Sequence, residues 1–229
     1  RMTADSSVPT REIVLGRSST VWQRLSADPS LAARVGAAIG HHDLDTFAFT
    51  PADRVWVLSY SREPRENSAM LQRLRAAGIR EIVYVTSAST IVAQRTRCYE
   101  YPRVKRQAEQ DALALPQAKL LTIGLMHDAV DELPSGTNIA TRYSEFAAFM
   151  LQPDWPDVGG RGKQLFHVEQ RPFGSAIERA ACTTYTSLLM ASGSRPCLLR
   201  PLDLILRLLG WRWYGYTCLS NRLWTSKTS

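Results

Sequence analysis

The chain has 229 residues, of which 45% are apolar and 21% are charged, and its formal net charge is +7 at pH 7. This composition predicts one folded domain of ordinary size with room for a small annex, and it excludes a chain that is disordered throughout. Because no apolar run approaches the roughly 20 residues of a membrane span, and residues 1–10 lack the apolar stretch of a secretory signal, we expect a cytoplasmic protein.

The first half of the chain alternates β-rich runs with helical patterns, as is typical of a parallel α/β sheet. The expected strands are residues 12–15, 35–39, 54–58, 81–86 and 119–124. The expected helices, with apolar positions three and four residues apart, are residues 19–34, 67–77 and 101–115. Gly78 follows the second of these helices, where a left-handed glycine commonly ends a helix. We therefore expect an α/β fold in which a Rossmann-like parallel sheet lies between two layers of helices.

The second half of the chain is less regular and predicts a small, mainly helical C-terminal lobe. Residues 142–151 have a helical pattern, and the segment 153–162, rich in proline and glycine, predicts a loop. Ser175 and Glu178 have the spacing of a capping box, which predicts a helix from there to about residue 191. Residues 201–209 predict a further short helix that is apolar on most of its circumference.

Residues 200–229 carry +4 of the net charge of +7, together with many aromatic residues. The charged residues of this segment are Arg200, Asp203, Arg207, Arg212, Arg222 and Lys227, and its tryptophans and tyrosines are Trp211, Trp213, Tyr214, Tyr216 and Trp224. Such a segment could contact an anionic surface or an anionic ligand. Its apolar helix could be covered by the lobe itself, by a second subunit of a homodimer, or by a membrane surface. No recognisable nucleic-acid-binding module accompanies the charge, so we expect no nucleic-acid partner.

Residue types that bind metals or form disulfides are scattered along the chain. The four cysteines form no C-x-x-C pair, which predicts neither a zinc site nor a disulfide framework and agrees with a reducing cytoplasm; they are Cys98, Cys182, Cys197 and Cys218. His41, His42, Asp43 and Asp45 are close in sequence, but nothing else supplies the ligand geometry of a metal site. We expect no bound metal.

The pattern with the most chemical content is Tyr101-Pro-Arg-Val-Lys105, which follows the strand that leads into Ser87. Tyr101 and Lys105 are four residues apart and share one face of a helix. A nearby ammonium group would lower the pKa of the tyrosine toward neutrality. Ser87 or Ser89 could hold a substrate oxygen at the carboxyl edge of the sheet, where open parallel sheets bind ligands. These side chains could transfer a proton to or from a carbonyl or an alcohol.

Three features occur in order: the strand with Ser87, the Y-x-x-x-K pair, and Glu109 four residues after the lysine. With them, residues 11–130 resemble the short-chain dehydrogenases/reductases, in their extended or atypical branch. The resemblance implies Tyr101 as the catalytic tyrosine, Lys105 as a ligand of the nicotinamide ribose, and a catalytic hydroxyl at Ser87, with Ser89 beside it. It also implies an NAD or NADP cofactor and a small-molecule substrate of the nucleotide-sugar kind, bound by an epimerase, dehydratase or ketoreductase. The domains would be a Rossmann-like domain over residues 1–130 and a substrate lobe over residues 131–229.

The glycine-rich loop of that family, G-x-x-G-x-x-G, is degraded in this sequence. Gly16 keeps the first glycine, but Ser19 and Trp22 replace the other two. These glycines let the backbone approach the pyrophosphate, so we expect dinucleotide binding to be weak or lost. Backbone amides helped by Arg17, Ser18 and Ser19 could still bind phosphate. Contact of Arg17 with a 2′-phosphate would slightly favour NADP over NAD.

The adenosine-binding half is also short, because only 37 residues separate Gly16 from Arg54. This is too few for two full strand–helix units. Asp43 could contact adenine, or could belong to an ordinary polar loop, and Ser59 completes the cofactor-binding residues that the resemblance implies. The alternative hypothesis keeps the fold without the dinucleotide, as a cofactor-independent enzyme with Tyr101 as acid or base, or as a non-catalytic binding protein.

Overall fold

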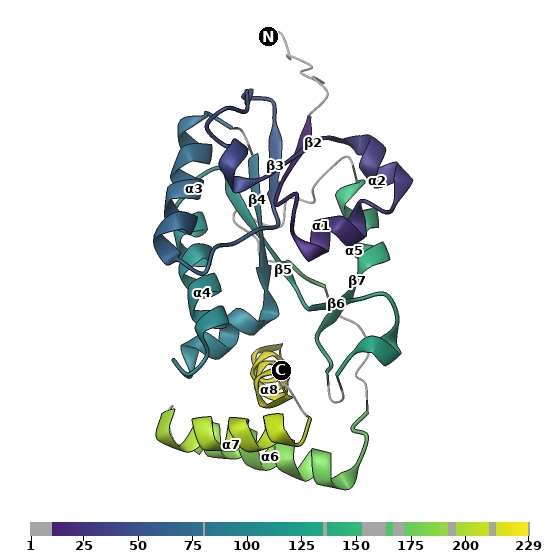
Figure 1. The fold of residues 1–229 in the computed structure, drawn as a ribbon, viewed down its shortest axis with the longest axis vertical. Helices are drawn as coiled ribbons and strands as arrows, with labels where there is room; N and C mark the ends of the chain where they lie inside the picture. The colour runs from purple at the N-terminus through teal and green to yellow at the C-terminus, as the bar shows by residue number, and fades with distance from the viewer. Residues whose placement is uncertain are drawn as a thin grey trace.

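The structure is a computed structural model, and it describes residues 11–79, 81–134, 137–152, 164–166, 172–191, 196–210 and 214–228. Figure 1 shows two parts, a twisted sheet with helices on both sides and a group of three helices at the end of the molecule remote from the N-terminus. The predicted loop at 153–162 lies outside the described residues.

The elements agree closely with the expected ones in the first half of the chain. The strands are β1 (Glu12–Leu15), β2 (Val35–Ile39), β3 (Arg54–Val57), β4 (Glu81–Ser87), β5 (Ala118–Ile123), β6 (Leu125–His127), β7 (Ala140–Arg142) and β8 (Gln164–Phe166). The α-helices are α1 (Thr20–Leu25), α2 (Pro29–Arg34), α3 (Pro64–Ala76), α4 (Glu100–Leu113), α5 (Tyr143–Met150), α6 (Ala176–Ala191), α7 (Pro196–Leu208) and α8 (Tyr214–Thr228). The 3₁₀ segments are η1 (His41–Asp43), η2 (Ala88–Gln94) and η3 (Val130–Glu132).

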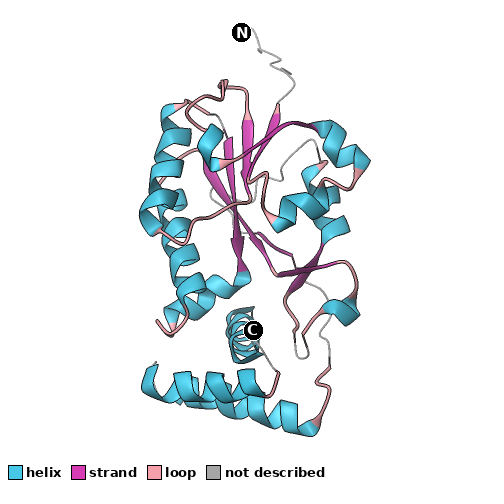
Figure 2. Cartoon of the chain, in the orientation of Figure 1, coloured by secondary structure: helices cyan, strands magenta, loops and turns pink. Residues whose placement is uncertain are grey.

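Six strands form one parallel sheet in the order β2-β1-β3-β4-β5-β8. The predicted α/β fold with a parallel sheet is therefore confirmed (Figure 2). The strand order reverses at β1, whose neighbours are β2 and β3. In open parallel sheets, ligands bind outside the carboxyl ends of the strands at such a point.

Alternating side chains of the strands face two apolar layers. The strand side chains on the same face of the sheet as Ile13 pack against α3 and α4. Those on the same face as Val14 pack against α1, α2 and α5. The helical residues on these two sides include Leu71, Leu74, Ala108, Trp22, Leu25, Leu31, Phe146 and Phe149. The sequence analysis placed α5 and β8 in the C-terminal lobe. In the structure, α5 packs against the sheet and β8 is the strand at its edge beside β5.

The connection from β2 to β3 explains the short spacing between Gly16 and Arg54. In the described chain, this connection contains only η1 and loops, and β2 is the edge strand of the sheet. The expectation of a compressed adenosine-binding half agrees with this topology.

The expected single helix over residues 19–34 is wrong, because the structure has two short helices there. Pro29 is the first residue of α2, and the Asp28 carboxylate caps that helix by accepting hydrogen bonds from the amides of Ser30 (2.9 Å) and Leu31 (3.3 Å). A proline lacks the amide hydrogen that would continue α1, so Asp28-Pro29 starts a new helix. The dipeptide was visible in the sequence and could have predicted this break.

Alternating charges cross the sheet at its amino edge, opposite the ligand-binding edge. Arg54 donates hydrogen bonds to Glu12 (3.0 Å) and Glu81 (2.8 Å), and Lys119 lies 2.9 Å from the other oxygen of Glu81. Burial raises the pKa of Glu12 despite its bond from Trp56, whereas the pKa of Glu81 is lowered because its bonds from Lys119 and Arg54 outweigh burial. We call the set Glu12, Arg54, Glu81 and Lys119 the charge ladder.

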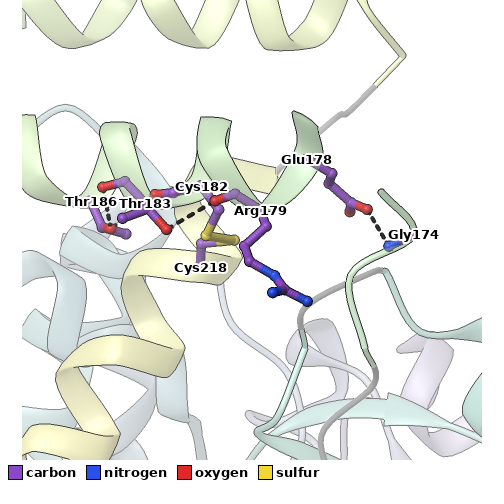
Figure 3. Close-up of a disulfide and its surroundings, with 7 residues drawn as sticks. All are labelled: Gly174, Glu178, Arg179, Cys182, Thr183, Thr186 and Cys218. Carbon is purple, nitrogen blue, oxygen red and sulfur yellow. Dashed lines mark hydrogen bonds between the residues drawn. A yellow bond between two sulfur atoms is a disulfide. The ribbon is translucent and has the colours of Figure 1, made fainter. Parts of the chain in front are cut away.

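The C-terminal lobe consists of α6, α7 and α8, and α8 was not predicted. The predicted cap of α6 is present in a modified form: the Ser175 hydroxyl accepts from the Glu178 amide (3.1 Å), and the Glu178 carboxylate accepts from the amide of Gly174, one residue before the cap (2.6 Å). The expectation of no disulfide is wrong, since Cys182 of α6 and Cys218 of α8 form one (Figure 3). Sequence spacing could not predict this pair, because it depends on how α6 packs on α8.

The lobe is attached to the sheet body through η2. The indole Nε1 of Trp224 in α8 donates a hydrogen bond to the carbonyl of Ala88. An apolar cluster joins α8 to η2 and to the other two helices; it contains Ala88, Ile91, Val92, Tyr185, Leu199, Leu206, Leu219, Leu223 and Trp224. The lobe therefore borders the segment that begins at Ser87.

In the part of the chain that the structure describes, no helix is long and apolar enough to cross a membrane. The same residues contain no group of three or more histidine, cysteine or acidic side chains placed to hold a metal ion.

Candidate active site

Three of the four residues predicted to be catalytic meet at the carboxyl end of β4. Ser87 is the last residue of β4, and its hydroxyl caps η2 by accepting a hydrogen bond from the Ser89 amide (3.3 Å). The hydroxyl groups of Ser87 and Ser89 are 2.8 Å apart. Ser87 also lies close enough to the hydroxyl of Tyr101, in the first turn of α4, to act on the pKa of that hydroxyl. The strand end, the cap and the helix start thus bring these side chains together.

The environment of Tyr101 differs from the expected one. Burial raises the pKa of Tyr101 to about 12, and the neighbouring Tyr60 phenol adds to this effect, while the nearby Ser87 hydroxyl opposes it. Tyr101 is still 37% exposed, so part of the residue reaches solvent. The expected lowering of this pKa by Lys105 is therefore wrong. At neutral pH the hydroxyl keeps its proton.

Lys105 shares the helix face with Tyr101, but its ammonium group is directed into the protein. Its Nζ donates to the carbonyl of Val85 (3.4 Å) and lies 4.7 Å from the ring centroid of Tyr60 and 5.4 Å from that of Tyr84. The side chain is only 5% exposed. Burial lowers the pKa of Lys105 to about 8, although the negative charge of Glu109 opposes this shift. This position explains why Lys105 does not act on the Tyr101 hydroxyl as expected.

Glu109 lies one helical turn beyond Lys105 and is buried. Its carboxylate accepts a hydrogen bond from Arg106 (2.9 Å) and a longer one from the Thr86 hydroxyl (3.4 Å). Glu109 therefore ties α4 to β4 and supplies the negative charge beside Lys105. Its role is to hold these elements in place.

Gly16 has a backbone conformation and a close contact that exclude other residues. Its φ is +127°, and a Cβ atom at this position would lie 2.9 Å from the Cβ of Ser59. The amides of Gly16 and Arg17 both donate to the carbonyl of Ile39 (2.8 and 3.0 Å). The first glycine of the expected loop thus packs β1 tightly against the end of β3, which agrees with the predicted place of Ser59 at this edge.

The other two loop positions have a different structure from a glycine-rich loop. The hydroxyl of Ser19 accepts a hydrogen bond from the amide of Trp22 (3.1 Å) and so caps α1, which has only six residues. Trp22 is 7% exposed and packs in the apolar layer with Leu25. Because a side chain caps the helix and a buried indole fills the third position, little of this loop is open to a pyrophosphate group.

The remaining predicted cofactor residues lie on the same edge. Arg17 Nη2 is 3.5 Å from a carboxylate oxygen of Asp43, which also accepts a hydrogen bond from the Gly40 amide (2.8 Å). Ser18 is exposed. Arg17 and Asp43 thus form an ion pair across the ends of β1 and β2.

Comparison with known proteins identifies the fold. No protein-family model and no curated protein matches the sequence. Among solved structures, an ethylated short-chain dehydrogenase/reductase from Veillonella parvula has a TM-score of 0.51 at 14% sequence identity, over 72% of this chain and 99% of that chain. The chain has the short-chain dehydrogenase/reductase fold.

Two further solved structures have somewhat lower similarity. A wide-type short-chain dehydrogenase/reductase from Veillonella parvula in complex with NADP has a TM-score of 0.49 and 12% identity, over 67% of this chain and 92% of that chain. ChuY, an anaerobillin reductase from Escherichia coli O157:H7, has a TM-score of 0.49 and 13% identity, over 70% of this chain and 97% of that chain.

Within this short-chain dehydrogenase/reductase fold, the sequence analysis missed two residues that adjoin the site. Tyr60 contacts both Tyr101, with ring centroids 5.2 Å apart, and Lys105. His41 Nε2 lies 2.8 Å from the Ser59 hydroxyl, and burial lowers the pKa of His41, so its ring is neutral at pH 7. The only sequence signal for these residues was that Tyr60 follows the end of β3 and His41 follows the end of β2. Since Ser59 and Tyr60 are consecutive, the residues predicted to be catalytic and those predicted to bind the cofactor meet at the end of β3.

A pocket of about 240 Å³ lies beyond His41, on the side of the shortened β2–β3 connection. It is lined by His41, His42, Leu44, Glu66, Ala69, Met70 and Arg73. The pocket therefore lies between the end of β2 and α3, and one residue of its lining, His41, contacts Ser59.

Proposed function

We propose that this protein is a nicotinamide-dependent oxidoreductase or epimerase of the short-chain dehydrogenase/reductase family, acting on a carbonyl or alcohol of a small molecule. A nucleotide-linked sugar is the substrate class that we favour. The observation that carries the proposal is the position of Tyr101, at the start of α4, beside Ser87 at the carboxyl end of β4, with Lys105 one helical turn farther along α4.

Tyr101 would act as the acid that completes reduction of a carbonyl group. A hydroxyl with a pKa raised to about 12 keeps its proton at neutral pH and can give it to an oxygen atom that gains electrons. Ser87 would hold that substrate oxygen, and Ser89 would orient Ser87 through the 2.8 Å contact of their hydroxyl groups. A nicotinamide cofactor, when bound, supplies the hydride that the carbonyl carbon accepts. In the reverse direction Tyr101 would take the proton back from an alcohol.

Some residues at the carboxyl edge of the sheet suit a dinucleotide, and others weaken its binding. Lys105 would hold the nicotinamide ribose, and Arg17, Ser18, Asp43 and Ser59 would lie along the adenosine half. The close packing at Gly16 supports this placement, whereas the capped Ser19 and the buried Trp22 support weak binding of the pyrophosphate. Arg17 is exposed, and a 2′-phosphate that replaced Asp43 as its partner would favour NADP over NAD.

The C-terminal lobe would contribute to the substrate site. Trp224 of α8 is hydrogen-bonded to Ala88, the residue between Ser87 and Ser89. Because the lobe is attached at this point, its side chains can contact a substrate that is held at Ser87. We therefore propose that residues 131–229 select the substrate, chiefly through the lobe of α6, α7 and α8.

The test is oxidation of NADPH or NADH in the presence of a panel of carbonyl compounds that includes nucleotide-linked keto-sugars. Tyr101→Phe should lower turnover by about 10²- to 10⁴-fold without changing the circular dichroism spectrum, because it removes only the proton donor. Tyr143→Phe, a half-buried tyrosine on α5, is the matched control and should keep full turnover. Near wild-type turnover of Tyr101→Phe would refute the assignment of Tyr101.

A second candidate function is a cofactor-independent enzyme, or a binding protein, on the same fold. It is favoured by Trp22 at the third loop position and by the Tyr60 ring over Lys105. In that case dinucleotides would not bind, and Tyr101 would serve only for proton transfer or for ligand binding.

A further inference from the structure

Helix α7 has an exposed apolar face. Three large apolar residues of the helix are exposed on that face, at 56% for Leu204, 53% for Ile205 and 78% for Leu208, and Leu209, the residue after the helix, is 60% exposed. Large apolar side chains grouped in this way on a folded protein mark a contact surface.

The opposite side of α7 is packed, so the exposed face is not a sign of an undocked helix. Leu199 and Leu206 are 1% and 3% exposed and lie in the cluster with α8 and η2, and Leu202 packs partly against it. At 100° per residue, Leu199 and Leu206 point roughly opposite to Leu204 and Leu208. The helix therefore has two apolar sides, of which the lobe covers one. Figure 1 places α7 at the end of the molecule remote from the N-terminus.

The charges on α7 are of one sign on the exposed side. Arg200 and Arg207 are exposed and two helical turns apart, along one border of the apolar face. The only acidic residue of the helix, Asp203, is half-buried and accepts a hydrogen bond from the Tyr99 hydroxyl (3.5 Å). In the sequence, Trp211 and Trp213 follow closely, residue types that favour membrane interfaces, although they lie outside the described residues.

We propose that α7 binds to the surface of an anionic phospholipid membrane. The helix would lie parallel to the surface, with Leu204, Ile205 and Leu208 among the acyl chains and Arg200 and Arg207 at the phosphate groups. Its 13 residues are too few to span a bilayer, so the contact is peripheral.

Charge favours a lipid surface over a second copy of the chain. A two-fold contact through this face would bring Arg200 and Arg207 of both copies to one interface, and α7 offers no exposed carboxylate to pair with them. Lipid phosphates supply the missing negative charge. The attachment is independent of the catalytic assignment, since no residue of the edge at Ser87 takes part.

The experiment is sedimentation of the full chain with vesicles of phosphatidylcholine alone and of phosphatidylcholine with phosphatidylglycerol at about 3:1. We expect binding to the anionic vesicles only. The double variant Leu204→Glu/Leu208→Glu should abolish it, and Arg200→Gln/Arg207→Gln should weaken it about 30-fold, from roughly 1 kcal/mol for each arginine. Ile177→Glu is the control, because Ile177 is 74% exposed but lies on α6; it should bind as wild type does. Thermal melts establish that each variant is folded.

Three results would overturn the proposal. The first is no binding of the wild-type chain to anionic vesicles, and the second is undiminished binding by the folded Leu204→Glu/Leu208→Glu variant. The third is a dimer in sedimentation velocity without lipid that becomes a monomer in the same variant, which would make the face a contact between two copies.

Discussion

The ring of Tyr60 lies over the ammonium group of Lys105, with Nζ 4.7 Å from the ring centroid. Lys105 is 5% exposed, and Tyr60 also contacts the ring of Tyr101. The tyrosine therefore covers the group that would hold the nicotinamide ribose. A ribose hydroxyl can reach Nζ only if this ring moves or is absent.

Shortening Tyr60 should therefore strengthen dinucleotide binding. Tyr60→Ala opens the space above Lys105, and we expect the affinity for NADPH to rise several-fold by calorimetry. Tyr60→Phe keeps the ring over the ammonium group and should bind as wild type does. Weaker binding by Tyr60→Ala would mean that the ring forms part of the cofactor site.

Lys105 should make stability depend on pH in the alkaline range. Its pKa is lowered from 10.5 to about 8, so between these values the folded chain binds fewer protons than the unfolded chain, and stability rises with pH. The difference corresponds to about 3 kcal/mol of cost below pH 8. We expect Lys105→Met to be more stable than wild type at pH 7 by up to that amount. Urea unfolding from pH 7 to 10.5 should show the gap closing, and a gap that is constant with pH would contradict the buried charge.

Arg54 should be the most sensitive position of the charge ladder. Arg54→Met leaves the buried Glu12 carboxylate without its 3.0 Å partner, and breaking such a buried pair costs about 3–5 kcal/mol. Arg73→Met is the control, because its pair with Asp45 is exposed and should contribute less than about 1 kcal/mol. Urea unfolding at pH 7 measures both losses. Equal losses in the two variants would refute the special role of the ladder.

The disulfide should stabilise the lobe without affecting the sheet. Cys182 and Cys218 are 36 residues apart, and closing a loop of this length is worth about 4 kcal/mol in the chain-entropy account. We expect Cys218→Ser to make α6–α8 susceptible to protease, while the fragment that contains the sheet stays resistant. Cys197→Ser removes an exposed free thiol and should change nothing. If dithiothreitol leaves the wild-type cleavage pattern unchanged, the disulfide does not hold the lobe.

The sheet and the Tyr101–Lys105–Ser87 group could be predicted because their signals are local. A buried strand, a helix period and an i, i+4 pair depend on neighbours in sequence. The orientation of Lys105 could not be predicted, since it depends on Tyr60 from another strand end. The same holds for the His41–Ser59 contact and for the Cys182–Cys218 bond, whose partners are 18 and 36 residues apart.

The central claim is that this edge of the sheet binds a nicotinamide dinucleotide. Calorimetric titration of the wild-type chain with NADPH, NADH and their oxidised forms tests it most directly. The account predicts saturable binding with a dissociation constant between about 1 µM and about 1 mM, tighter for the NADP forms. No detectable heat with any of the four at millimolar concentration would contradict it and favour the cofactor-independent alternative.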